Sequence, residues 1–298
     1  MRASSRSSMA VVGPGAIGTS IAVALHEAGR TPMLCGRTRR EHLTLEEGER
    51  RFTVPGPVRV DPEQLERTVD LVFLAVKATQ TEAAAAWLVA LCHPETVVCV
   101  LQNGVEQLER VAHCVPFARL VPTVVWFPAQ AQPGGSVRLR GDMRLSLPDT
   151  PDARVVAEAL RGTRCSVELS ASFTGLAWRK LMQNAVAGLM ALTHRRSGMF
   201  ARPDIAELAL AYLQEGLAVA RAEGVELGDE VPQQVLDMFR ASPADMGTSI
   251  LTDRESGRSL EWDVRNAVIA RRGRARGIPT PVSDVVVPLL AAASDGPG

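Results

Sequence analysis

The first half of the chain alternates short apolar runs with segments in which apolar residues recur at helical spacing. Short apolar runs bounded by turn residues are typical of buried strands, whereas recurrence every three or four positions is typical of helices. The predicted strands are 9–12, 32–35, 70–76, 96–101 and 120–127, and the predicted helices are 17–27, 79–91 and 105–112. This alternation predicts a parallel sheet that is covered by helices on both faces.

The hydrophobic pattern changes after Pro128. Residues 137–139 and 143–147 alternate apolar and polar positions, as antiparallel strands with one wet face do. A short helix over 155–160 and a last strand over 165–169 complete this part of the chain.

From about Ser172 onward, the chain shows only helical periodicity. Helices are predicted over 176–192, 205–223, 231–240 and 260–276, with a last one that begins after 280–283 and ends before Gly296. Ser259 is a candidate N-cap and Gly277 a stop signal for the fourth of these helices. The chain is therefore predicted to be α/β, with a doubly wound sheet over residues 1–170 and an all-α C-terminal domain over residues 171–298.

The charge balance and the cysteine content exclude several classes of protein. The 298 residues carry 33 basic and 33 acidic side chains, so the basic surface of a nucleic-acid or anionic-membrane binder is not expected. No apolar stretch is long enough to span a bilayer. The five cysteines, an odd number without a Cys-x-x-Cys pair, favour neither a disulfide framework nor a metal site. They indicate a reducing compartment, and we expect a cytoplasmic protein.

The first eight residues are rich in serine and arginine and lack the apolar core of a signal peptide. We interpret them as a loose tail. Met9 begins the first predicted strand and is, beside Met1, a second candidate start of translation.

A glycine-rich turn joins the first predicted strand to the first predicted helix. Its residues are Gly13, Pro14, Gly15, Ala16, Ile17 and Gly18. In a dinucleotide site, Gly13 would permit the tight turn, Gly15 the approach of a pyrophosphate and Gly18 close packing of helix on strand. The helix N-terminus would attract the phosphates. The alternative is a strand-to-helix turn that merely tolerates glycine, but the strand–turn–helix context favours a Rossmann-type cofactor domain.

The residues after the second predicted strand bear on the choice of cofactor. NAD binders usually carry an acidic residue there, whereas this chain has the basic segment 36–40. An arginine fork suits the additional phosphate of NADP. A solvated basic loop is the alternative. We predict NADP as the cofactor, with Arg37 as its leading contact.

Five separated patches together resemble the ketopantoate reductases, which are also called 2-dehydropantoate 2-reductases. The patches are 12–18, 75–77, 102–104, 178–184, and 249–253 followed by 261–263. The similarity runs from Met9 to about Ser283. It implies NADPH-dependent reduction of 2-dehydropantoate to pantoate, on the route to pantothenate and coenzyme A.

The resemblance also implies roles for residues of the second half of the chain. Lys180 would donate the proton to the carbonyl oxygen and stabilise its developing charge. Asn184, one helical turn further on, and Ser249 would bind substrate oxygens. Glu261 would close over the cofactor. A solvated helix position is the default for an isolated lysine, and helix-start chemistry is the alternative for Ser249 and Glu261.

Two residues of the first half complete the implied site. Asn103 follows the predicted strand 96–101 and would contact both the nicotinamide ribose and the substrate. Lys77 follows the preceding strand and would serve the cofactor. Open α/β sheets bind ligands at this carboxyl edge. We expect both groups of residues to meet in a cleft between the two domains.

Two departures from the family pattern affect the choice of substrate. Gly188 replaces a second asparagine, and Ser197-Gly198 replaces an asparagine-glycine pair. The expected partner is a small 2-oxo acid, and binding to nucleic acid or to a membrane is not expected. A homodimer through the helical domain is a possible assembly. A reductase of a different branched 2-oxo acid, or a non-catalytic NADP-binding regulator, are the alternatives. The presence of Lys180 and Asn184 argues against a regulator.

Overall fold

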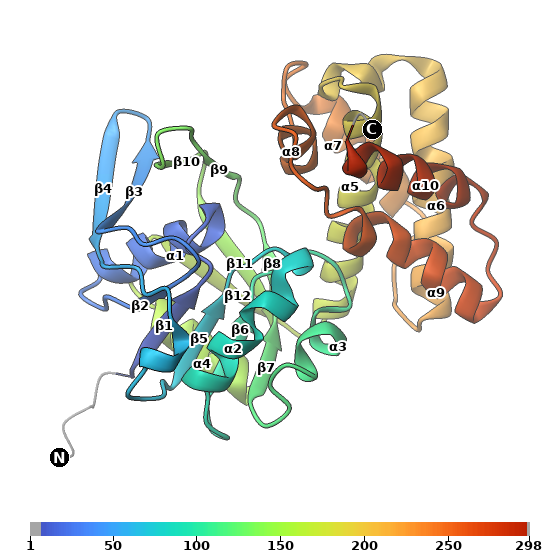
Figure 1. Cartoon of the computed structure of the whole chain (residues 1–298). Helices are drawn as coiled ribbons and strands as arrows, with labels where there is room; N and C mark the ends of the chain where they lie inside the picture. The colour runs from blue at the N-terminus through green and yellow to red at the C-terminus, as the bar shows by residue number, and fades with distance from the viewer. Residues whose placement is uncertain (1–6, 297–298) are drawn as a thin grey trace. The chain divides into compact units, whose positions relative to one another are not determined.

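The computed structural model describes residues 7–296. The expectations for a loose tail and for a start at Met1 concern residues that lie almost entirely outside this range. The chain divides into two compact units, of which the first ends at Phe173 and the second begins at Thr174 (Figure 1).

A five-stranded parallel sheet forms the centre of the first unit. Its strands are β1 (Met9–Val12), β2 (Met33–Cys35), β5 (Leu71–Leu74), β6 (Val97–Val100) and β7 (Arg119–Pro122). The spatial order is β2-β1-β5-β6-β7, and all neighbours are parallel. After β2 the chain returns to the opposite side of β1, so the strand order reverses between β1 and β5. Doubly wound sheets bind ligands at such a reversal, at the carboxyl ends of the strands.

Helices cover both faces of this sheet, as the sequence predicted. On one face, Val11 and Phe73 pack with α1 (Ala16–Glu27) and α4 (Pro151–Leu160). Their neighbours Val12 and Leu74 point to the opposite face, where α2 (Thr81–Leu91) and α3 (Gln107–Ala112) pack. Successive strand residues alternate between the two cores because the side-chain period of a strand is two.

Two smaller sheets complete the first unit. The first contains β3 (His42–Glu47), β4 (Arg50–Pro55), β9 (Ala129–Ala131) and β10 (Val137–Leu139), in the order β4-β3-β10-β9. The second contains β8 (Val124–Val125), β11 (Met143–Pro148) and β12 (Cys165–Ser170), in the order β12-β11-β8. The β3–β4 hairpin had not been recognised in the sequence. Single-turn 3₁₀ helices, η1 (Pro62–Gln64) and η2 (Ala78–Gln80), link the larger elements.

The prediction of antiparallel strands over 137–139 and 143–147 was right for one neighbour of each strand and wrong for the other. β10 runs parallel to β3 and antiparallel to β9, and β11 runs parallel to β12 and antiparallel to β8. The two strands therefore belong to different sheets. Alternation reports which face of a strand is wet, but it carries no information about the partner strand.

The second unit is helical throughout its described part. It contains α5 (Phe173–Thr193), η3 (Ser197–Ala201), α6 (Pro203–Ala222), α7 (Val231–Ala241), α8 (Ser249–Glu255), a π-helical turn η4 (Asp263–Ala267), α9 (Val268–Arg276) and α10 (Pro281–Asp295). Among the described helices, none combines the length and the apolar character that a membrane crossing requires.

The start of the predicted helix 260–276 was wrong, whereas its end was right. The helical segment begins at Trp262, and Leu260 lies in the preceding loop, where it is buried and its backbone N–H donates to Oγ of Ser294 at 2.9 Å. Ser259 is therefore not an N-cap, and Glu261 precedes the helix instead of lying in its first turn. Gly277 ends α9 in the left-handed conformation, at φ 68°.

Candidate active site

The glycine turn between β1 and α1 has the geometry that its sequence predicted. Gly13 has φ 89°, which disfavours residues with a side chain, and its N–H donates to the carbonyl of Cys35 at 2.9 Å. A Cβ on Gly13 would lie 2.6 Å from Cγ1 of Val76. The turn is therefore held between the ends of β2 and β5, at the reversal of strand order.

The other two glycines of the turn are required for different reasons. A Cβ on Gly18 would lie 2.2 Å from the carbonyl oxygen of Gly13, so only glycine allows α1 to pack this closely. A Cβ on Gly15 would meet nothing within 4 Å, and Gly15 is exposed. Gly15 is also the N-cap of α1 and has no side chain with which to accept a hydrogen bond from the first turn. The space over Gly15 and the positive end of α1 fit a pyrophosphate.

The basic segment after β2 lies beside this turn. A Cβ on Gly36 would come within 2.7 Å of Cδ of Pro14, so the end of β2 packs directly against the glycine turn. Arg37 follows and is exposed. Arg39 pairs with Glu41 at 3.2 Å. An exposed arginine next to the turn can receive an additional phosphate, whereas an acidic residue at that position would repel it.

Lys77 and Asn103 follow β5 and β6 and are both partly buried. Their neighbour Gln102 lies in the patch 102–104, but the sequence assigned it no role. Its Nε2 donates to the carbonyl of Val76 at 3.3 Å and to Oγ1 of Thr81 at 2.9 Å. These bonds join the loops after β5 and β6. Gln102 is buried, and its position between two predicted site loops was the available signal.

In the second unit, Lys180 and Asn184 lie one turn apart on α5. Lys180 is partly buried and Asn184 is buried. Ser249 begins α8. Sequence reasoning missed Arg265, which joins Asn184 to Ser249. Its Nη2 donates to Oδ1 of Asn184 at 2.7 Å, and its Nη1 donates to Oγ of Ser249 at 3.1 Å.

The surroundings of Arg265 are acidic and buried. Burial lowers the pKa of Arg265 from its ordinary value, and the carboxylates of Glu261 and Asp253 oppose this shift. Glu261 and Asp253 are themselves buried. The structure thus brings Asn184, Ser249 and Glu261 into one cluster around Arg265. The signal for Arg265 was a charged residue inside the apolar run 264–270.

The two departures from the family pattern have structural explanations. A Cβ on Gly188 would lie 2.7 Å from Nδ2 of Asn266 and 3.0 Å from Cδ1 of Leu290, so the amide of Asn266 occupies this position. Ser197 is buried, and its Oγ donates to the carbonyl of Phe239 at 2.7 Å. Ser197 therefore joins η3 to α7.

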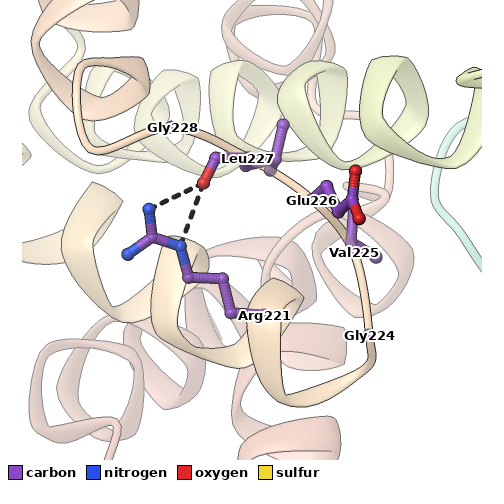
Figure 2. Close-up of a pocket in the computed structure, with 6 residues that line it drawn as sticks. All are labelled: Arg221, Gly224, Val225, Glu226, Leu227 and Gly228. Carbon is purple, nitrogen blue, oxygen red and sulfur yellow. Dashed lines mark hydrogen bonds between the residues drawn. The ribbon is translucent and has the colours of Figure 1, made fainter.

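A surface hollow elsewhere in the second unit is lined by none of the candidate residues. The residues that line it are Arg221, Gly224, Val225, Glu226, Leu227 and Gly228 (Figure 2). Arg221 donates from Nε and Nη2 to the carbonyl of Leu227, which closes the loop between α6 and α7 on itself (Figure 2). Arg221, on the last turn of α6, thus fastens this loop to the helix that precedes it.

Several titratable groups lie outside the candidate site. The five cysteines are free and buried. Glu82, His113 and Cys114 place potential metal-ligand atoms within 4.8 Å of one another, at α2 and the end of α3. The hydrogen bond between His113 and Glu82 raises the pKa of the imidazole, as in a common surface pair.

The parallel sheet, the glycine turn at its strand reversal and the helical second unit define a two-domain protein whose first unit has the fold of dinucleotide-binding domains. Residues 9–152 match the family described as ketopantoate reductase PanE/ApbA, and residues 172–294 match its C-terminal domain. The chain therefore belongs to the ketopantoate reductase family.

Individual relatives are similar over nearly the whole chain. A 2-dehydropantoate 2-reductase of Mycobacterium tuberculosis is 53% identical over 291 residues, which cover 97% of this chain and 99% of that protein. One of Caulobacter vibrioides is 35% identical over 288 residues, which cover 96% of this chain and 99% of that protein. Among solved structures, a dimeric ketopantoate reductase from Staphylococcus aureus has a TM-score of 0.89 at 28% identity and covers 98% of this chain and 100% of that chain.

Proposed function

We propose that this protein reduces 2-dehydropantoate to pantoate with NADPH, in the biosynthesis of pantothenate and coenzyme A. The observation that carries this proposal is the 53% identity to a 2-dehydropantoate 2-reductase along 97% of the chain. The glycine turn and the cluster around Arg265 support it, because they supply a dinucleotide cradle and a polar site for a small acid.

The residues of the first unit fit the proposed cofactor. The open space over Gly15 leaves room for a pyrophosphate next to the N-terminus of α1. Arg37 would bind the phosphate that distinguishes NADPH from NADH. Lys77, Asn103 and, from the second unit, Glu261 would contribute further contacts. The bound cofactor supplies the hydride that reduces the substrate.

The residues of the second unit would complete the chemistry. As C2 of the 2-oxo acid receives hydride, its carbonyl oxygen acquires negative charge. Lys180 would donate a hydrogen bond to this oxygen and then transfer a proton to it, which yields the alcohol. The resulting neutral amine regains a proton from water. Asn184 and Ser249 would hold the carboxylate and orient C2. The meeting of these residues with those of the first unit stays a prediction.

The nearest alternative substrate is another branched 2-oxo acid. Position 188 offers no side chain, and Asn266 occupies the adjacent space. The decisive experiment measures NADPH oxidation against a panel of 2-oxo acids that includes 2-dehydropantoate. We expect the highest kcat/KM for 2-dehydropantoate. A higher value for another acid would transfer the proposal to that acid, and turnover of none would favour the non-catalytic regulator.

We also propose a homodimer that forms through the helical unit. Val285 and Leu289 lie one turn apart on α10 with 60% and 53% of their surfaces exposed. Apolar residues that are exposed on one face of a helix are suited to burial against a second copy. Light scattering coupled to size exclusion would give the mass of a dimer. Leu289→Asp should shift this mass toward that of the monomer.

A further inference from the structure

The guanidinium of Arg265 joins two residues for which the proposed function provides a substrate role. It donates to Oδ1 of Asn184 on α5 and to Oγ of Ser249 on α8, and its side chain is buried. The three residues are far apart in the sequence and meet only in the folded unit. A buried arginine that bonds two neutral side chains is unusual, because buried charges are generally paired with opposite charges.

The chemistry of the guanidinium determines how its two partners are oriented. Arginine has only donors, so the atom of Asn184 that faces it must be the carbonyl oxygen. With this oxygen turned toward Arg265, the other terminal atom of Asn184 is its amide nitrogen, which donates hydrogen bonds and does not accept them. Ser249 accepts from Arg265 through its oxygen, so its own hydroxyl proton is directed elsewhere. Arg265 thereby converts both side chains into donors that suit an acceptor-rich ligand such as a carboxylate.

The charge of Arg265 is incompletely compensated by hydrogen bonding. Its Nε has no hydrogen-bond partner among residues 7–296. Glu261 and Asp253 are the acidic groups that act on it, and Asp253 also accepts from Nε of Arg258 at 3.0 Å. The two buried carboxylates thus balance the charge of Arg265, and its hydrogen bonds are left for Asn184 and Ser249.

Arg265 and the following residue, Asn266, both lie in the π-helical turn. Arg265 and Asn266 are consecutive, yet both reach α5: Arg265 bonds Asn184, and Nδ2 of Asn266 donates to the carbonyl of Ala185 at 2.9 Å. In a regular α-helix, consecutive side chains point about 100° apart. Single π-helical turns frequently occur at functional sites, where they alter the direction of side chains.

We propose that Arg265 is a positioning and specificity residue, which holds Asn184 and Ser249 as donors toward the carboxylate of the substrate and favours an acid over an uncharged analogue. This inference rests on the proposed function, because it assumes that Asn184 and Ser249 bind a 2-oxo acid. A purely structural tie between α5, α8 and the π-helical turn is the competing explanation. Only the positioning role changes the preference between charged and uncharged substrates.

The test compares 2-dehydropantoate with its uncharged methyl ester, using NADPH in the parent protein and in three variants. Arg265→Met keeps an apolar stem and removes the charge. Arg265→Lys keeps the charge but not the two-pronged hydrogen bonding. Arg240→Met is the matched control, since Arg240 lies in the same unit and donates from Nε to the carbonyl of Phe200. For each protein, kcat, KM, the Kd of NADPH and the Tm are measured.

For Arg265→Met, we expect the ratio of kcat/KM between acid and ester to fall about 10- to 100-fold, mainly through the KM of the acid. The Kd of NADPH should be unchanged. Arg265→Lys should retain part of the preference, and Arg240→Met should retain all of it. In an Asn184→Ala background, Arg265→Met should have a smaller effect, because both changes act on one contact.

Three outcomes would overturn the inference, and they are distinguishable. If Arg265→Met lowers the Tm but leaves the acid-to-ester ratio unchanged, Arg265 is only structural. Should Arg265→Met fail to fold, an unchanged ratio in Arg265→Lys leads to the same conclusion. If the parent reduces no 2-oxo acid of the panel, the proposed function fails first, and this inference fails with it.

Discussion

The amide of Asn266 lies against Gly188, so close that a Cβ on Gly188 would come within 2.7 Å of Nδ2. Asn266 is fully buried, and its Nδ2 donates to the carbonyl of Ala185 and, at 3.0 Å, to the hydroxyl of Tyr212. Two hydrogen bonds therefore hold the amide where it is. The absence of a side chain at position 188 is a requirement of this packing.

This contact predicts that Gly188→Ala destabilises the protein. Alanine favours a helix by about 1 kcal/mol over glycine, whereas overpacking of a core costs about 1–3 kcal/mol. We expect the clash to prevail, with a net loss of up to about 2 kcal/mol in the free energy of unfolding. Urea denaturation measures this loss. Gly175→Ala, on the same helix but with its nearest neighbours at 3.7 Å, is the control and should not destabilise. A Gly188→Ala protein more stable than the parent would contradict the packing argument.

The geometry of the glycine turn predicts that alanine at position 15 weakens cofactor binding, whereas alanine at position 18 lowers stability. Gly15→Ala should leave the Tm nearly unchanged, because a Cβ there meets nothing, but it should weaken NADPH binding. A clash of about 1.4 kcal/mol with the pyrophosphate would suffice for a tenfold loss. Gly18→Ala should lower the Tm, since its Cβ would lie 2.2 Å from the carbonyl oxygen of Gly13. Calorimetry and cofactor titration distinguish the two. Unchanged NADPH binding in Gly15→Ala would show that the pyrophosphate lies elsewhere.

The position of Arg37 predicts the preference for NADPH over NADH. Loss of one charge-assisted hydrogen bond costs about 1.5–3 kcal/mol, or roughly 10- to 150-fold in affinity. Arg37→Ala should reduce the preference by this factor, with little change in the affinity for NADH. Arg39→Ala serves as the control, because Arg39 pairs with Glu41. Equal binding of NADH and NADPH to the parent protein would refute the role of this segment.

The assignment of Lys180 predicts a loss of turnover without a loss of cofactor. General acid catalysis contributes about 10²–10⁴-fold, so Lys180→Ala should lower kcat by that factor. The Kd of NADPH should change little, and Arg179→Ala, at the neighbouring position of α5, should retain activity. Asn184→Ala should mainly raise KM, and the double variant should be less impaired than the product of the two effects predicts. A folded Lys180→Ala protein with the kcat of the parent would rule out this proton donor.

The buried cysteines predict thiols that are inert in the folded protein. Burial raises the pKa of Cys35, Cys92, Cys99 and Cys165 to about 12. Because a raised pKa leaves almost no thiolate near neutrality, iodoacetamide at pH 8 should not label these cysteines. Labelling should become complete in guanidinium chloride. Mass spectrometry identifies which cysteines carry the label. Rapid labelling of any of the four under native conditions would contradict the described burial.

Sequence alone sufficed for features whose determinants are local. The first four strands of the central sheet follow from hydrophobic period, and the glycine turn follows from six consecutive residues whose roles depend on one another. The predicted strand 120–127 was wrong as a single strand, because it is divided between β7 of the central sheet and β8 of another sheet. The end of α9 was also predictable, because Gly277 adopts a conformation that glycine favours. In each case the physical cause lies within a few positions of the residue concerned.

Tertiary structure decided the features that depend on distant partners. The sequence shows that β10 and β11 alternate apolar and polar residues, but only the fold assigns them to different sheets. It shows an arginine in an apolar run at 265, but only the fold brings that arginine to Asn184 and Ser249. Gly188 is likewise explained by Asn266, which lies far along the chain. Pattern reports burial and local geometry, whereas the identity of a contact depends on how the whole unit packs.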